Sequence, residues 1–164
     1  MSMNEEQFIK RDRMRFTKNT LSSSLAVLAI LFNILYFVSI YKSDIGSYYY
    51  NILIGASILY NLIFMLVVFL SSEGVKGYKA SFAYALLAVG VLQIVRIFIL
   101  PMRAHTAAVT INQQEVIVME TAQFLRVVVY LVVSAVCCLV AGVVGIQKSR
   151  ALAAHMAVLE QKVA

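Results

Sequence analysis

The chain has 164 residues, of which 62% are hydrophobic and 13% are charged. Soluble domains are usually about 45–50% hydrophobic and about 25% charged, and a small soluble domain keeps much of its surface in water. The composition therefore excludes an ordinary soluble domain. Most of the positive residues behind the net charge of +6 flank the apolar runs, which indicates contact with acidic membrane lipids rather than with nucleic acid.

Four apolar runs are long enough to cross a bilayer, which takes about 20 residues of helix. They cover residues 21–41, 52–70, 80–100 and 124–146, and none contains an acidic residue. The third run stops at Pro101, which cannot donate into a continuing helix. The sequence predicts an all-α fold, an integral membrane up-down bundle of four transmembrane helices.

The first run has one alternative interpretation, a cleaved signal peptide. Its basic flank fits a signal peptide. Its apolar stretch exceeds the roughly 7–15 residues typical of that region, and no A-x-A site follows. We therefore predict that the run is retained as a signal-anchor.

Lysine and arginine counts in the loops predict the orientation in the cell membrane. One side has Lys10, Arg11, Arg13, Arg15, Lys18, Lys76, Lys79, Lys148, Arg150 and Lys162, whereas the other has Lys42 and Arg103. Both termini should therefore be cytoplasmic. The predicted segments are a basic N-terminal segment (1–20), the transmembrane domain (21–146) and a cytoplasmic tail (147–164).

Three segments outside the spans carry their own expectations. Residues 4–20 form either a short interfacial helix or a plain basic flank. The long outer loop, 101–123, is either a contact surface or a passive flap, and within it residues 109–119 favour a small hairpin or an extended strand. The tail should be an amphipathic helix docking on lipid, a second copy or another subunit through Leu152, Met156, Leu159 and Val163.

Two arginines inside the spans give the sharpest site hypothesis, because an intramembrane charge is costly. Each has a glutamine three residues before it on the same helix face, so that Gln93 precedes Arg96 and Gln123 precedes Arg126. The two guanidinium groups could together clamp an anion or a partner's carboxylate at the outer leaflet. Counter-charges would come from Asp44, Glu115, Glu120 or a partner. The alternative is that both arginines snorkel to the headgroups.

Other polar and small residues in the spans favour helix packing. Asn33 and Asn61 lie near the middles of the first two spans, where a cross-helix hydrogen bond is the expected role. A strip of small residues on the fourth span predicts a close packing seam, within the chain or against another subunit. The strip consists of Ser134, Cys138, Ala141, Gly142 and Gly145.

The sequence contains no Gly-rich phosphate loop, no metal-ligand spacing and no nucleophile–base pair. We therefore expect no catalytic residue, cofactor or metal. The leading hypothesis is a non-enzymatic accessory or structural subunit of a larger membrane complex, with a transporter as the expected host. The alternatives are a small homo-oligomeric channel or carrier for an anionic solute, and a membrane enzyme. The expected partners are lipids and other membrane subunits or further copies of the chain, and not nucleic acid.

Overall fold

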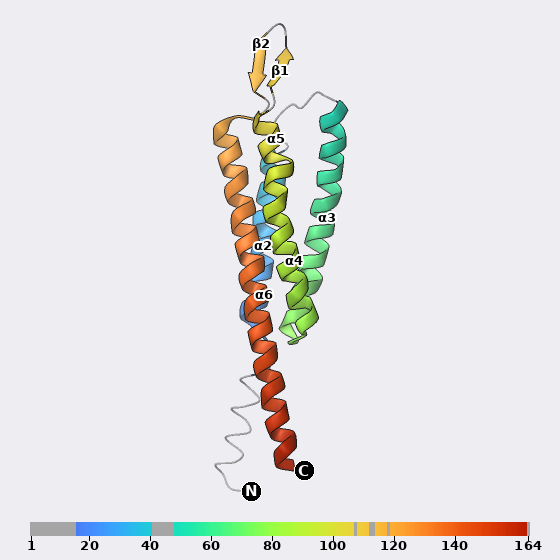
Figure 1. Cartoon of the computed structure of the whole chain (residues 1–164), viewed down its shortest axis with the longest axis vertical. Helices are drawn as coiled ribbons and strands as arrows, with labels where there is room; N and C mark the ends of the chain where they lie inside the picture. The colour runs from blue at the N-terminus through green and yellow to red at the C-terminus, as the bar shows by residue number, and fades with distance from the viewer. Residues whose placement is uncertain (1–15, 41–47, 107, 112–113, 118, 164) are drawn as a thin grey trace.

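A computed structural model describes residues 16–40, 48–106, 108–111, 114–117 and 119–163. The side chains of 48–54, 108–117 and 159–163 lie outside this description. Four long helices lie side by side, with a short helix and a two-stranded hairpin at one end (Figure 1). The elements are α2 (Thr20–Ile40), α3 (Tyr48–Lys76), α4 (Ala80–Ile99), α5 (Pro101–Thr106), β1 (Ala108–Ile111), β2 (Gln114–Ile117) and α6 (Thr121–Val163).

Each of the four predicted spans is confirmed as a helix long and apolar enough to cross a membrane. The candidate membrane segments within the described residues are Thr20–Ile40, Gly55–Lys76, Ala80–Thr106 and Thr121–Val158. Many large apolar side chains on these helices point outward, among them Leu59, Phe98 and Leu125 at 60% exposure or more. In a soluble protein so many exposed apolar groups would drive aggregation, whereas lipid solvates them.

Local signals set the helix ends. The Asn19 side-chain oxygen accepts from the Ser22 backbone N–H at 3.4 Å, which is an N-cap geometry for α2. At the far end of α3, Gly77 and Tyr78 turn the chain through backbone bonds to Gly74 and Val75. Tyr78 has a φ of 60°, a left-handed conformation that redirects the chain into α4.

Helix α6 packs along both α2 and α4, while α3 lies at the edge of the bundle against the same two helices. The buried residues form two apolar clusters, one toward each end of the bundle. One contains Ala26, Phe64, Val68, Leu86 and Cys138, and the other contains Tyr36, Ile40, Leu100, Val127 and Leu131. Between the two clusters, buried polar residues on α2, α3, α4 and α6 form the site described below.

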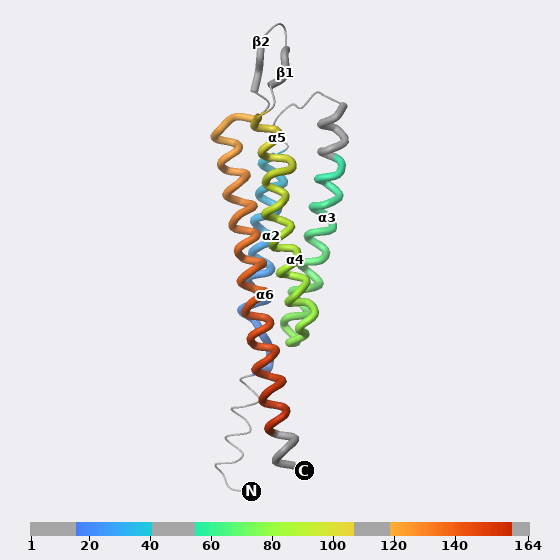
Figure 2. The backbone as a smooth tube through the Cα atoms, viewed as in Figure 1, coloured from blue at the N-terminus to red at the C-terminus, as the bar shows by residue number. Residues whose placement is uncertain are grey.

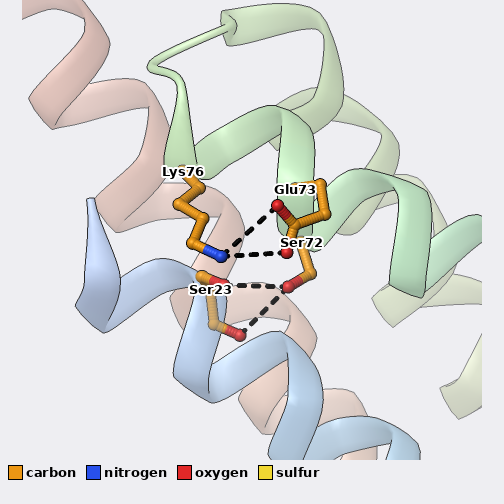
Figure 3. A network of polar contacts seen from close by, with 4 residues as sticks. All are labelled: Ser23, Ser72, Glu73 and Lys76. Atoms are coloured by element: carbon orange, nitrogen blue, oxygen red, sulfur yellow. Dashed lines mark hydrogen bonds and ion pairs between the residues drawn. The ribbon is translucent and has the colours of Figure 1, made fainter. Parts of the chain in front are cut away.

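Hydroxyl groups join α2 to α3 at the end where α2 begins. The hydroxyls of Ser23 and Ser72 lie 2.9 Å apart, and Lys76 and Glu73 of α3 form an ion pair of 3.0 Å beside them. Figure 3 shows both contacts. Next to them, the Asn19 N–H donates to the Lys76 carbonyl at 3.1 Å. The start of α2 is therefore fastened to the end of α3.

Helix α6 differs most from the sequence prediction, because the fourth span and the tail are one continuous helix. Its 43 residues span about 64 Å at 1.5 Å per residue, about twice the 30 Å hydrocarbon core of a bilayer. Figure 2 shows the last part of α6 running past the ends of the other helices. Residues 147–163 contain no Gly or Pro and are rich in Ala, Leu, Lys and Gln, so nothing local stops the helix.

The loop after α4 contains α5 and then an antiparallel hairpin, in which Ala108 pairs with Ile117 and Ile111 with Gln114. Of the two structures expected for residues 109–119, the hairpin is therefore the one that forms. It adds two short strands to a chain predicted to be all helical. We predicted an interfacial helix or a basic flank for residues 4–20, and of these residues 4–15 lie outside the described part of the chain.

Candidate functional site

Arg96 is buried in the bundle and hydrogen-bonded to two other helices. Only 5% of the residue is exposed. Its Nη1 donates to Oδ1 of Asn61 at 2.8 Å and to Oδ1 of Asn33 at 3.3 Å, and its Nη2 donates to Oγ of Ser57 at 2.8 Å. The planar fork of a guanidinium suits such a set of fixed acceptors, so one charge connects α4 to α2 and α3.

Two tyrosine rings complete the surroundings of this charge. The Arg96 Cζ lies 4.3 Å from the centroid of the Tyr36 ring and 4.7 Å from that of Tyr60. A desolvated cation over an aromatic ring gains roughly 2 kcal/mol, and a hydrogen bond to a charged group about 1.5–3 kcal/mol. A central arginine costs about 2.5–3.5 kcal/mol on insertion scales. The neutral oxygens and the rings together therefore offset the cost of burying the guanidinium.

Gln93 extends the polar cluster to the fourth long helix. Its Nε2 donates to Oδ1 of Asn33 at 3.0 Å and to Oγ of Ser134 at 3.3 Å. The Ser134 hydroxyl in turn donates to the Ala29 carbonyl at 2.9 Å. A single network therefore joins α2, α3, α4 and α6. Asn33 and Asn61, expected to make cross-helix hydrogen bonds, both accept one from Arg96.

Some buried polar atoms in this region have no hydrogen-bond partner within the described part of the chain. They are Oε1 of Gln93, Nδ2 of Asn33 and the hydroxyl of Tyr60. A buried polar atom left unsatisfied costs about 1–3 kcal/mol. The Tyr60 hydroxyl is the informative one, because Tyr60 also lines a pocket.

That pocket lies between α3 and α4 and has a volume of about 180 Å³. Arg96, Ser57 and Tyr60 supply its polar wall. The remaining described lining is apolar and consists of Ala56, Leu92, Val95, Ile99 and Leu100. Leu92, Val95 and Ile99 are each close to half exposed, so the pocket reaches the outer, lipid-facing surface of α4.

The structure does not bring the two predicted arginines together. Arg126 is exposed on α6 while Arg96 faces inward, and the Gln123 side chain donates to the Ser39 carbonyl at 2.9 Å instead of joining Gln93. Arg96 is therefore held by groups of α2 and α3, whereas Arg126 is exposed. The clamp of two guanidinium groups and the snorkelling interpretation stay predictions. In the packed bundle α4 turns its arginine inward and α6 turns its arginine outward. The sequence of a helix that is apolar on every face does not reveal which face turns inward. Glu120 is exposed, and the side chains of Asp44 and Glu115 lie outside the description.

The strip of small residues on α6 packs within the chain. Ser134, Cys138, Gly142 and Gly145 are all buried. A Cβ on Gly142 would lie 2.9 Å from the Ala83 carbonyl oxygen, and one on Gly145 would lie 2.9 Å from Cβ of Ala83. The Ser22 hydroxyl donates to the Ala141 carbonyl at the same seam. The strip was expected to pack either within the chain or against another subunit. It packs within the chain, against α2 and α4.

The tail of α6 contacts the segment before α2 and the turn before α4. The Ser149 hydroxyl donates to the Tyr78 carbonyl at 2.8 Å, and the His155 ring stacks on Phe16 with centroids 5.2 Å apart. Of the predicted docking residues, Leu152 is half-buried and Met156 is 50% exposed. The side chains of Leu159 and Val163 lie outside the description.

Within the described ranges, no three His, Cys, Asp or Glu residues come together to hold a metal ion. Cys137 and Cys138 are buried free thiols. No protein-family model, curated protein or solved structure matches this chain. What the chain can do is therefore argued from its own residues.

Sequence reasoning missed three members of the cluster: Ser57, Tyr36 and Tyr60. A signal for them exists in the spacing. Tyr36 lies three residues after Asn33. Ser57 lies four residues before Asn61, and Tyr60 lies one residue before it. Residues three or four apart share a helix face, so each of the first two spans has one polar and aromatic face, which marks the side turned toward Arg96.

Proposed function

We propose that this chain is a non-catalytic, multi-pass membrane protein that serves as an accessory or structural subunit of a larger membrane complex, with a transporter as the host. The proposal is supported by the buried polar residues, which form hydrogen bonds between the helices of the bundle. Arg96, Gln93 and Ser134 each donate a hydrogen bond to a residue of a neighbouring helix. Such a bundle is a rigid body suited to positioning another protein.

In this proposal the four helices run up and down through the cell membrane, with both termini in the cytoplasm. The bias of lysine and arginine toward one set of loops supports that orientation. Two contacts support the alternation. The start of α2 bonds to the end of α3 through Asn19 and Lys76, and the start of α6 bonds to the end of α2 through Gln123 and Ser39.

The observation that carries the proposal is the length of α6. It continues from the span into a projecting helix ending at Val163. On this projection Met156 is 50% exposed. Apolar side chains on a helix outside the bilayer gain free energy when a partner covers them. The projecting part of α6 is therefore the proposed docking element, presented to a neighbouring subunit on the cytoplasmic side.

A photocrosslinking amino acid placed at Met156 in the full-length chain, in its native membrane, tests the docking role. The matched control is Ala154, which is also exposed but lies about 200° around the helix from Met156. The proposal expects one discrete adduct from position 156, with a multi-pass membrane protein that also co-purifies in fixed stoichiometry. Equal labelling from both positions, or a purified chain that is monomeric and free of partners, would contradict it.

A second candidate function is a small homo-oligomeric channel or carrier for an anionic solute. The observation that favours it is the charged guanidinium of Arg96 in the wall of a pocket. This role expects a symmetric oligomer and anion flux in proteoliposomes that is lost in Arg96→Ala. Flux that survives the substitution would rule out an anion path through this residue.

A further inference from the structure

The pocket between α3 and α4 combines a buried cation, Arg96, and a buried hydroxyl, that of Tyr60, with an opening toward lipid. We propose that it binds the anionic headgroup, a carboxylate or a phosphate, of a single-chain amphiphile that enters from the bilayer between these two helices. The inference is independent of the accessory role, because it concerns a ligand of this chain and not a protein partner. Arg96 and Tyr60 are the residues assigned to the headgroup.

The charge and the hydroxyl of the wall select an anion. Arg96 is a permanent cation, and electrostatic attraction strengthens in surroundings of low dielectric constant. Tyr60, whose ring lies 4.7 Å from the same guanidinium, lines the same pocket. Its hydroxyl is buried and has no acceptor within the described residues. An oxyanion would give that hydroxyl an acceptor and at the same time attract the guanidinium by its charge. A neutral oxygen would accept the hydrogen bond without that attraction, and a cation would be repelled.

The rest of the wall selects a hydrocarbon chain. The described apolar lining leads from Leu100 and Ile99 along α4 to Leu92, and Ala56 faces it from α3. An apolar cavity of roughly 150 Å³ holds a benzene ring, so 180 Å³ is enough for a headgroup and its first methylene groups. It is too small for a whole lipid, since drug-sized ligands occupy about 300–1,000 Å³. The rest of the ligand's hydrocarbon chain therefore lies outside the pocket, along the exposed surface of Val95 and Leu92.

The site is held ready before a ligand arrives. Arg96 is fixed by its bonds to Asn61 and Ser57 at 2.8 Å each, and the rings of Tyr36 and Tyr60 restrict it further. Fixing a flexible side chain on binding costs about 0.5–1.5 kcal/mol. That cost is largely met in the fold, so the bonds to a headgroup contribute to affinity almost in full.

Native mass spectrometry of the purified full-length chain in a non-ionic detergent tests the proposal. The probes are hexadecanoate and hexadecyl phosphate, with hexadecanol as the uncharged match and inorganic phosphate as the headgroup without a chain. The variants are Arg96→Gln, Tyr60→Phe and Ala56→Leu. Ala56→Leu narrows the pocket from α3 and removes no residue of the polar cluster, so it remains informative if Arg96→Gln does not fold. The matched control is Arg126→Gln, which removes an exposed arginine that also follows a glutamine by three residues.

We expect one saturable adduct per chain with either charged amphiphile. Its affinity should fall about tenfold or more in Arg96→Gln and in Ala56→Leu, and about threefold or more in Tyr60→Phe, whereas Arg126→Gln should bind like the parent protein. Any of three results overturns the proposal. They are no saturable adduct, equal binding of hexadecanol, or equal losses in Arg96→Gln and Arg126→Gln. If inorganic phosphate competes with the same affinity as the amphiphile, the hydrocarbon chain contributes nothing to binding. The pocket would then be a site for a free anion and not for an amphiphile.

Discussion

The substitution Gly142→Ala tests the close approach of α6 to α4. A Cβ at this position would lie 2.7 and 2.8 Å from side-chain atoms of Leu87, and 2.9 Å from the carbonyl oxygen of Ala83. The leucine can rotate away, but the carbonyl belongs to the backbone of α4. The helices would have to separate by about 0.5 Å, the difference between 2.9 Å and the 3.4 Å at which ordinary contact begins.

Gly55 provides the matched control, because it also lies in a membrane-spanning helix but a Cβ there would meet nothing within 4 Å. Both substitutions gain the same helix propensity, about 0.8–1 kcal/mol in water. The difference between their free energies of unfolding therefore isolates the steric cost, which for overpacking is about 1–3 kcal/mol. Gly55→Ala should be neutral or stabilising, and Gly142→Ala should be the less stable of the two by that difference.

Reversible unfolding of the purified chain in mixed micelles, driven by a rising fraction of denaturing detergent and followed by far-ultraviolet circular dichroism, measures both values. The slope of the transition should be unchanged, because neither variant alters the surface exposed on unfolding. If both variants shift the midpoint equally, α4 and α6 are not packed as closely as the described contact requires. The reasoning about the small-residue strip would then fail.

Three further substitutions probe the polar cluster by the same unfolding measurement. Asn61→Leu removes the 2.8 Å acceptor of Arg96 and should destabilise by about 1.5–3 kcal/mol; no change would mean that this bond contributes nothing net. Ser134→Ala removes the bond to Ala29 and should cost about 0.6–1.7 kcal/mol, against no cost for Ser81→Ala at an exposed site of α4. Arg96→Lys keeps the charge but loses the planar fork between two rings, so it should destabilise by at least about 1 kcal/mol, whereas Arg126→Lys should be neutral; equal effects would show that charge alone matters at position 96.

The location of the four helices that are long and apolar enough to cross a membrane was predictable from sequence, because it depends on local quantities. A run of about 20 apolar residues must hydrogen-bond its own backbone in lipid, and only a helix does so within one segment. That argument needs no knowledge of any neighbour, and it located α2, α3, α4 and the first part of α6. The uninterrupted α6 was also readable in principle, since residues 147–163 are good helix formers without a breaker.

The candidate site was predictable only in part. Arg96, Gln93, Asn33 and Asn61 were singled out because polar groups in lipid need partners. Arg126 carries the same local pattern as Arg96, yet one is exposed and the other is 5% exposed. Tyr36 and Tyr60 were not singled out, although each lies three residues after a polar residue, Asn33 or Ser57, on the same helix face.

What the sequence alone determined is where the four helices that could cross a membrane lie and which of their residues are costly in lipid. What only the tertiary structure decided is the rotation of each helix about its axis. A helix that is apolar all round has no preferred inward face in lipid, so cross-helix bonds such as Arg96 to Asn61 and close contacts such as Gly142 to Ala83 select that face. Those interactions exist only once α2, α3, α4 and α6 lie against one another.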